Sequence, residues 1–344
     1  MKHTPILLIG NSPNQLAGSG HSWKELMEAL CKIAGMKSTG NEEKPFTLHF
    51  EELLCHFRAA RVRRMSGTER KRLRSRSYPF RQYLDLQFKL KVAERMRKLP
   101  VDKVHAALMK LPVQNILTTN YDFCLERAVD PEPKSADWKT RERQFSLFQR
   151  RKAGGRFVFH IHGEVGTPST IVLGHEAYVE SCANIRRYAH GKGNYYRGAK
   201  RYLKAKFRRG SGRIHGPHAW VDLFMLRDVH IVGFGLEFTE VDIWYLLSYK
   251  SRLRYESDAP ADLKRSRIYF HYFADDSPRC CAKIALLESF GVECRCHPIP
   301  VGEDGTKNYR RAWKRLLKYL TVALSPRSPA RRRQSRQNQR TRSS

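Results

Sequence analysis

Residues 116–122 read Ile-Leu-Thr-Thr-Asn-Tyr-Asp, and our interpretation of the chain starts from this stretch. Its apolar, β-branched beginning, Asn115 to Thr118, is typical of a buried strand. Such a strand delivers Thr119, Asn120 and Asp122 to its carboxyl end, where open α/β sheets bind their ligands. An amide beside a carboxylate at that edge predicts a binding or catalytic site. The structural alternative is that Asn120 or Asp122 only caps the helix that follows.

Six short apolar runs of this kind occur in the chain, and segments with helical spacing separate them. They cover residues 5–9, 115–118, 157–161, 229–233, 268–273 and 292–297. Strands that are apolar throughout and alternate with helices indicate a parallel sheet covered on both faces. We therefore expect an α/β fold, with a Rossmann-like, mainly parallel six-stranded sheet and helices on both faces.

Capping residues mark the expected helices. Ser22 and Glu25 have the spacing of a capping box in front of an apolar stripe, and Gly35 is a suitable helix stop. Further helices are predicted over 102–111, after Thr239 as N-cap, and over 307–320.

The chain is strongly basic. Its 344 residues include 65 Lys and Arg against 33 Asp and Glu, a net charge of +32. Hydrophobic residues make up 41%, which is enough for a core and excludes a wholly disordered chain. Basic residues concentrate in 58–76, in 183–213 and in the last twenty residues. Charge of this kind attracts nucleic acid, anionic lipid or acidic proteins.

These basic stretches shape the expected domain organisation. We predict one domain over residues 1–324, with basic helical insertions at about 56–100 and 180–220 and a disordered Arg-rich tail over 325–344. The insertions and tail can contact DNA or RNA, bind an acidic partner protein, or form a solvated face. The sequence does not distinguish a monomer from a homo-oligomer.

The sequence predicts no membrane segment. No apolar run approaches the roughly 18 residues that span a bilayer, and residues 5–9 are too short for a signal-peptide core. We therefore expect a cytoplasmic protein whose eight Cys are mostly reduced.

The first strand is followed by a small polar loop. This loop contains Gly10, Asn11, Ser12 and Asn14, and the Ser22 helix comes after it. A strand, a small loop and a helix N-terminus together form a common phosphate-binding arrangement. The alternative is an ordinary turn between a strand and a helix.

Two further strand ends carry candidate groups. His160-Ile161-His162-Gly163 ends the third run. Alternation along a strand puts both histidines on one face. A histidine at this position can serve as a general base or be purely structural. Gly233-Phe234-Gly235 ends the fourth run, and its glycines allow either close approach to a ligand or a tight turn.

In this order, the four motifs resemble the Sir2-like family, and more closely the bacterial Sir2-like proteins of antiphage defence. The matching stretches are 6–14 with Ser22-Trp23, 116–122, 160–163 with 171–173 and Tyr178, and 229–235 with Asp242-Ile243. The resemblance implies a sirtuin-type fold that binds NAD⁺ across its strand ends.

The resemblance also implies roles for single residues. Asn120 and Asp122 would lie at the nicotinamide and its ribose, and His162 would be the catalytic base. The residues implied to hold the rest of NAD⁺ are Gly10, Asn11, Ser12, Asn14, Thr118, Thr119, Gly233, Phe234, Gly235 and Asp242.

The expected activity is that of an NAD⁺ glycohydrolase, which cleaves NAD⁺ to nicotinamide and ADP-ribose and, by resemblance, depletes NAD⁺ in antiphage defence. Two alternatives stay open: a non-catalytic sensor of NAD⁺ or ADP-ribose, and a nucleic-acid-binding protein with a vestigial pocket.

Two departures from the family pattern bear on this expectation. The two separated Cys-x-x-Cys pairs of protein-deacylating sirtuins are missing, so hydrolysis fits better than deacylation. Cys294, Cys296 and His297 lack a standard zinc spacing, and we expect no metal. Ser12-Pro13 replaces the glycine more usual in relatives, which changes the expected geometry of the phosphate loop.

Overall fold

The computed structural model describes residues 4–18, 22–36, 44–74, 80–132, 134–135, 145–191, 203, 219–257, 259–275 and 277–325. Within them one sheet has the strand order β3-β4-β5-β2-β1-β6-β7-β8. Its strands are β1 (Ile6–Ile9), β2 (Asn115–Thr118), β3 (Lys134–Ser135), β4 (Arg151–Ala153), β5 (Arg156–His160), β6 (Val229–Val232), β7 (Ile268–Phe273) and β8 (Val292–His297).

The six predicted strands are confirmed, and they pair in parallel from β5 to β8. The prediction of six strands was nevertheless too low, because β3 and β4 add an antiparallel edge beside β5. These two strands are two and three residues long and mostly polar. They therefore carry no hydrophobic pattern that sequence analysis can detect.

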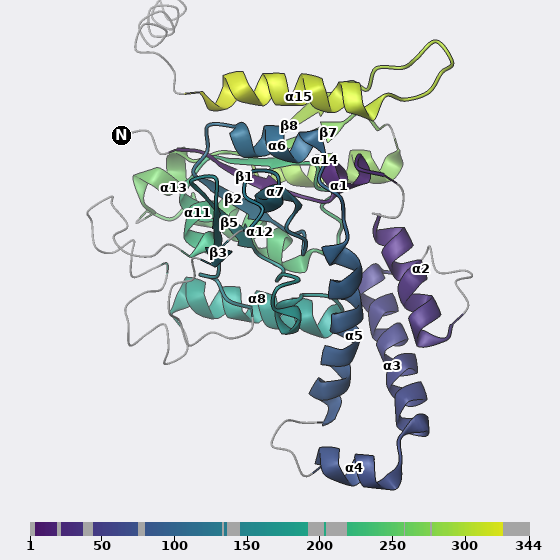
Figure 1. Cartoon of the computed structure of the whole chain (residues 1–344). Coiled ribbons are helices and arrows are strands. Elements are labelled where there is room, and N and C mark those ends of the chain that lie inside the picture. The colour runs from purple at the N-terminus through teal and green to yellow at the C-terminus, as the bar shows by residue number, and fades with distance from the viewer. Residues whose placement is uncertain are drawn as a thin grey trace, which may run out of the picture.

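Helices cover both faces of the sheet, as predicted (Figure 1). Leu7 and Ile9 of β1 pack with α6 (Lys103–Lys110), α7 (Cys124–Arg127) and α15 (Tyr309–Leu324). Ile6 and Leu8 belong to the opposite cluster, which contains α8 (His175–His190), α11 (Trp220–Leu226), α12 (Val241–Leu253), α13 (Ala261–Arg265) and α14 (Pro278–Ser289). Burial on both sides explains why the central strands are apolar throughout.

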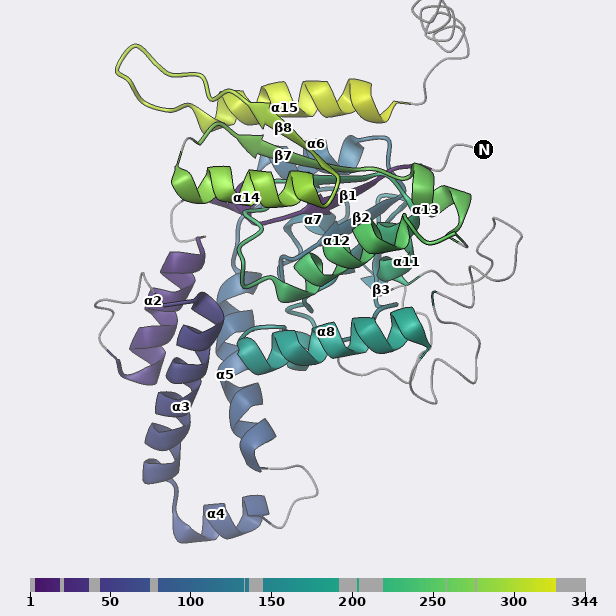
Figure 2. The same cartoon turned by 180° about the vertical axis from the view of Figure 1, so that it is seen from behind.

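The remaining helices form an arm beside the sheet. The arm consists of α2 (Trp23–Ala34), α3 (Phe46–Arg64), α4 (Gly67–Arg74) and α5 (Phe80–Arg97). Two short helices are not counted in the arm: the one-turn α1 (Ser12–Gln15) and the 3₁₀ helix η1 (Pro168–Thr170). Figures 1 and 2 show α3 and α5 running away from the sheet, with α4 at the tip of the arm. The arm covers the region of the first predicted insertion and begins before residue 56, and its status as an insertion into a single domain stays a prediction.

Three basic side chains of the arm, Arg63, Arg64 and Lys71, are exposed to solvent. Binding of nucleic acid by the arm stays a prediction. Most of the second predicted insertion (residues 192–202 and 204–218) and the tail from residue 326 lie outside the described residues. No helix in the described part of the chain has the length and apolar character required to cross a membrane.

The predicted capping residues are confirmed in one helix and wrong in another. Ser22 and Glu25 form a reciprocal capping box at α2, and Gly35 ends that helix with φ +73°. Thr239 does not cap α12, which begins at Val241 after Glu240. The helix starts later than expected because Glu240, with φ −77° and ψ +57°, lies outside the helical region of backbone conformation.

Candidate functional site

A cavity of about 450 Å³ opens at the carboxyl ends of the central strands. Its walls include six of the predicted NAD⁺-binding residues: Asn11, Ser12, Thr119, Gly233, Phe234 and Gly235. The other lining residues are Gln15, Trp23, Phe46, Leu236, Glu237, Glu240, Phe270, His271, Tyr272, Phe273, Asp275, Cys280 and Lys283. A larger cavity of about 570 Å³ lies between α3, α5 and α8 and contains none of the predicted residues. The strand-end cavity is the better candidate, because open α/β sheets bind ligands at this edge.

The loops after β1 and β6 touch each other behind this cavity. The Ser12 N–H donates to the Gly233 carbonyl at 2.9 Å. A Cβ on Gly10 would lie 2.4 Å from the Phe234 Cα and 2.6 Å from the Gly233 oxygen. Gly10 therefore permits the close approach of two loops whose residues line the cavity.

Asn14 and Asp122 join the loop after β1 to the loop after β2. The Asn14 Nδ2 donates to Asn11 Oδ1 and to Asp122 Oδ2, both at 2.8 Å. The His105 Nδ1 accepts the Asp102 N–H, so its Nε2–H donates to Asn14 Oδ1 at 2.9 Å. Burial lowers the pKa of His105, consistent with this neutral imidazole.

The second Asp122 oxygen accepts the Cys124 N–H at 2.9 Å. Both carboxylate oxygens of this buried residue are therefore engaged in holding the loops. The sequence gives no signal for His105, because its contact with Asn14 joins positions 91 residues apart.

Asn120 joins the same two loops from the β2 side. Its Nδ2 donates to the Gly10 carbonyl at 3.1 Å. Thr118 is fully buried, and its hydroxyl donates to the Ile9 carbonyl and accepts the Asn120 N–H. Thr118 thus supports the loop from behind and does not line the cavity.

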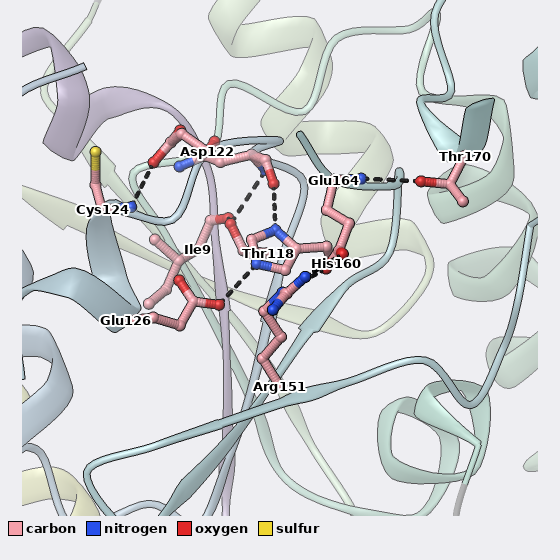
Figure 3. Close-up of polar contacts among 10 residues, drawn as sticks. Ile9, Thr118, Asp122, Cys124, Glu126, Arg151, His160, Glu164 and Thr170 are labelled. Carbon is pink, nitrogen blue, oxygen red and sulfur yellow. Dashed lines mark hydrogen bonds and ion pairs between the residues drawn. The ribbon is translucent and has the colours of Figure 1, made fainter. Parts of the chain in front are cut away.

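His160 and His162 contact different elements, and the expectation that they share one strand face was wrong. Strand β5 ends at His160 and the chain turns there, which breaks the alternation. The His160 ring contacts the Asn120 carbonyl and Glu126 Oε1 of α7, each at 2.7 Å (Figure 3). Burial opposes protonation of His160, but Glu126 outweighs it and raises the pKa of His160 to about 9.

We predict that Glu126→Gln lowers the free energy of unfolding by about 3 kcal/mol near pH 6.5, since it breaks a buried ion pair. The folded pKa of His160 lies above its unfolded value, so the pair stabilises fully below about pH 6.5 and is lost as the pH rises through about 9. Urea denaturation at pH 6.5 and 9 should therefore show a difference between variant and wild type that shrinks at the higher pH. If the unfolding free energies of wild type and variant differed equally at both pH values, the assignment of a charged His160 paired with Glu126 would be contradicted. Glu132→Gln, at an exposed position, is the matched control.

His162 lies between two buried carboxylates. Its Nε2 is 3.0 Å from Asp242 Oδ2, and its Nδ1 is 3.7 Å from Glu240 Oε2. The Tyr178 hydroxyl donates to Glu240 at 2.9 Å, and the Ser181 hydroxyl donates to Asp242 at 3.2 Å. Burial lowers the pKa of His162, but Asp242 and then Glu240 outweigh it, so the net shift is upward. Burial is the main cause that raises the pKa of Glu240 to about 7.

The predicted catalytic residues thus fall into two groups. Asn120 and Asp122 bond to the loop after β1, whereas His162 bonds to Asp242 at the start of α12. Among the described residues, no hydrogen bond joins His162 to either of the other two. The cavity wall connects the groups, because Thr119 lines it beside Asn120 and Glu240 lines it beside His162.

Comparison with known proteins matches residues 114–238 to the SIR2-like domain family. This part of the chain is similar to SIR2-like domains. A stretch of 74 residues is 35% identical to the NAD(+) hydrolase ThsA of Acinetobacter baumannii and covers 22% of this chain and 15% of that protein. A stretch of 80 residues is 35% identical to the NAD(+) hydrolase ThsA of Bacillus cereus and covers 23% and 16%. The match therefore spans about a sixth of the length of these relatives.

The segment that matches this family contains Asn120, Asp122 and His162. It ends before Glu240 and Asp242, and it begins after the β1 loop. Glu240 was not among the site residues predicted from the sequence. The sequence signal that points to it is an acid that closely follows the glycine-rich end of a strand.

His162, Glu240 and Asp242 are also the group in the described part of the chain that could hold a metal ion, with ligand atoms within 4.8 Å of one another. The hydroxyls of Tyr178 and Ser181 donate to the same carboxylates. The two carboxylates, the imidazole and the two hydroxyls thus form a hydrogen-bonded network. The absence of a metal stays a prediction.

A histidine ladder (His230, His271 and His297) crosses β6, β7 and β8 beside the cavity. The neighbouring rings are hydrogen-bonded at 3.0 Å in each step. Burial lowers the pKa of His230 to about 4 and that of His271 to about 3. The protein therefore holds these rings neutral, since His271 must accept one hydrogen bond and donate the other.

We predict that the ladder makes stability depend on pH. The folded pKa of His271 lies below its unfolded value, so its contribution is present above about pH 6.5 and is lost as the pH falls toward 3. Between pH 7 and 5, wild type should lose about 2 kcal/mol more unfolding free energy than His271→Gln. Parallel pH dependences in urea denaturation would refute this, and the exposed His56→Gln is the control that should follow wild type.

Proposed function

We propose that this protein is an NAD⁺ glycohydrolase that releases nicotinamide and ADP-ribose. The observation that carries the proposal is the strand-end cavity, whose walls combine the loops after β1 and β6 with Thr119. The NAD(+) hydrolases named above share identity with part of this chain, and its SIR2-like segment contains Asn120 and His162. We further propose that the reaction depletes NAD⁺ during antiphage defence in the cytoplasm.

The residue types suit this chemistry. Nicotinamide leaves as a neutral group, and the ribose carbon becomes oxocarbenium-like, as in glycoside hydrolysis. In the proposal, the Asn120 amide orients the ribose or the attacking water, and Asp122 holds the loop that positions it. The buried carboxylates near His162 stabilise positive charge in a site of low dielectric constant.

The proposal is tested by incubating the full chain with NAD⁺, with and without DNA or a phage lysate as activator, and measuring free nicotinamide. Stoichiometric release of nicotinamide and ADP-ribose is the expected result. Saturable NAD⁺ binding in calorimetry without product under every condition would instead support a sensor. Absence of both binding and turnover would leave nucleic-acid binding through the basic arm as the remaining candidate function.

A further inference from the structure

Helix α15 has one buried and one exposed face. Its apolar side chains Trp313, Leu316 and Leu320 are buried in the core on one side of the sheet. The Trp313 Nε1–H also donates to Ser12 Oγ at 3.2 Å, which ties the inner face of the helix to the loop after β1. Figures 1 and 2 show α15 at the end of the molecule opposite the tip of the arm. The apolar face is therefore used within the fold, and the opposite face meets solvent.

The exposed face carries a row of four basic side chains, which we call the α15 basic row: Arg311, Lys314, Arg315 and Lys318. Their spacing of three and four residues puts them on one side of the helix, over a length of about 10 Å. The helix contains neither Asp nor Glu. Within the part of the chain that the structure describes, none of the four side chains forms an ion pair, whereas Arg310 pairs with Asp102 at 2.9 Å.

The four charges of the α15 basic row repel one another. Cations three and four residues apart are neighbours on a helix surface, and such like-charge pairs destabilise the helix. The arm is built differently, because basic residues there have acidic partners: Arg58 pairs with Asp85, and Arg61 pairs with Glu69 at 3.3 Å. The described residues therefore leave the charge of the α15 basic row uncompensated, and an anion from outside the chain would relieve the repulsion.

We propose that the exposed face of α15 binds the phosphate backbone of nucleic acid through the α15 basic row. Phosphates follow one another at about 3.4 Å per strand along a double helix, so a row of about 10 Å spans about three phosphates of a strand. Contacts between basic side chains and phosphates carry no base information, so the binding is independent of nucleotide sequence. The row lies outside the three basic stretches identified in the sequence, which are 58–76, 183–213 and the last twenty residues.

The surroundings of the row favour nucleic acid over a membrane or an acidic protein. A helix that lies on a membrane buries its apolar face in lipid, but that face of α15 is already packed against the sheet. The cores of protein–protein interfaces are depleted of charged residues, whereas interfaces with DNA are strongly positive. Residues 326–344, which follow the helix in the sequence, contain seven Arg and neither Asp nor Glu, so the same charge continues along the chain.

The test measures binding of the full chain to a short DNA duplex by fluorescence anisotropy, between about 50 and 200 mM salt. The variant combines Arg311→Gln, Lys314→Gln, Arg315→Gln and Lys318→Gln, since glutamine removes the charge and keeps a good helix propensity. Each phosphate contact contributes about 0.9 to the slope of log affinity against log salt, so the slope should become shallower by about 3–4. Over this range of salt, wild type should therefore lose about 10²-fold more affinity than the variant.

The matched control removes the same number of charges from exposed residues in or next to the arm: Arg63→Gln, Arg64→Gln, Lys71→Gln and Lys98→Gln. It should keep nearly the wild-type slope. A wild-type slope in the α15 variant, or an equal loss of slope in both variants, would overturn the proposal. An RNA duplex of the same sequence, measured in parallel, shows which nucleic acid the face prefers, and a loss of slope with either duplex supports the proposal. If the α15 variant lost affinity for polyglutamate but kept wild-type binding of both duplexes, the partner would be an acidic protein and the proposal would be wrong.

Urea denaturation verifies the fold of the α15 variant, which should be no less stable than wild type because the repulsion within the row is removed. If the fourfold variant does not fold, Lys314→Gln combined with Lys318→Gln tests the same face, with a slope expected to be shallower by about 2. The proposal does not depend on the proposed function. A protein that releases no nicotinamide under any condition refutes the NAD⁺ hydrolase and leaves the binding experiment unaffected.

Discussion

Replacing Gly163 with alanine should lower the free energy of unfolding by about 4 kcal/mol and abolish NAD⁺ turnover. Gly163 has φ +84°, which costs an L-residue roughly 1–2 kcal/mol. Its Cβ would also lie 2.1 Å from the Thr170 carbonyl oxygen and 2.7 Å from the Ile171 nitrogen, and such overpacking costs about 1–3 kcal/mol more. Because both obstacles are backbone atoms, relief requires moving the segment that carries His162.

Gly35→Ala separates backbone strain from steric clash. Gly35 has φ +73°, close to that of Gly163, but no other group lies within 4 Å of the point that a Cβ would occupy. This variant should lose only about 1 kcal/mol in urea denaturation, which is the strain alone. Equal losses for the two variants would show that the packing of Gly163 against Thr170 is not as tight as described.

Asn120→Ala should reduce kcat/KM for NAD⁺ by about 10²–10³-fold, the usual effect of removing one preorganised polar group at a reacting centre. The change also leaves the Gly10 carbonyl without its 3.1 Å hydrogen bond, at a cost of about 1–3 kcal/mol in stability. The folded protein should persist, because the strands around this loop are deeply buried.

Nicotinamide release measures the activity, and urea denaturation verifies the fold. Gln15→Ala is the control: it changes a residue of the cavity wall that has an exposed side chain, and it should change kcat/KM by less than about tenfold. Asn120→Ala with full activity and a normal fold would remove Asn120 from the proposed mechanism.

Most of the sheet could be predicted from sequence, for a physical reason. β2, β7 and β8 have the predicted bounds. For β2 this is because a buried parallel strand is apolar on both faces and forms an unbroken run. The edge strand β8 is half-exposed and partly polar, so this reason does not apply to it. Strands β3 and β4 escaped detection, since a few polar residues at an edge leave no pattern. The capping box of Ser22 and Glu25 could also be predicted, because it involves only residues that are close together in the sequence.

The candidate site was predictable only in part. The glycine-containing loops and Thr119 were predicted correctly as neighbours of the cavity, because a strand end followed by small residues can be recognised within one short stretch of sequence. The contacts of His105 with Asn14 and of Glu240 with His162 join distant segments, and nothing local encodes them. The turn after His160 reversed the expected direction of His162, since a strand period applies only while the strand continues.

The most direct test of the central claim is a crystal structure of the protein with ADP-ribose bound. The account predicts the pyrophosphate against the loops after β1 and β6, with the ribose C1′ within reach of Asn120. ADP-ribose bound instead in the cavity between α3, α5 and α8, with the strand-end cavity unchanged, would contradict it.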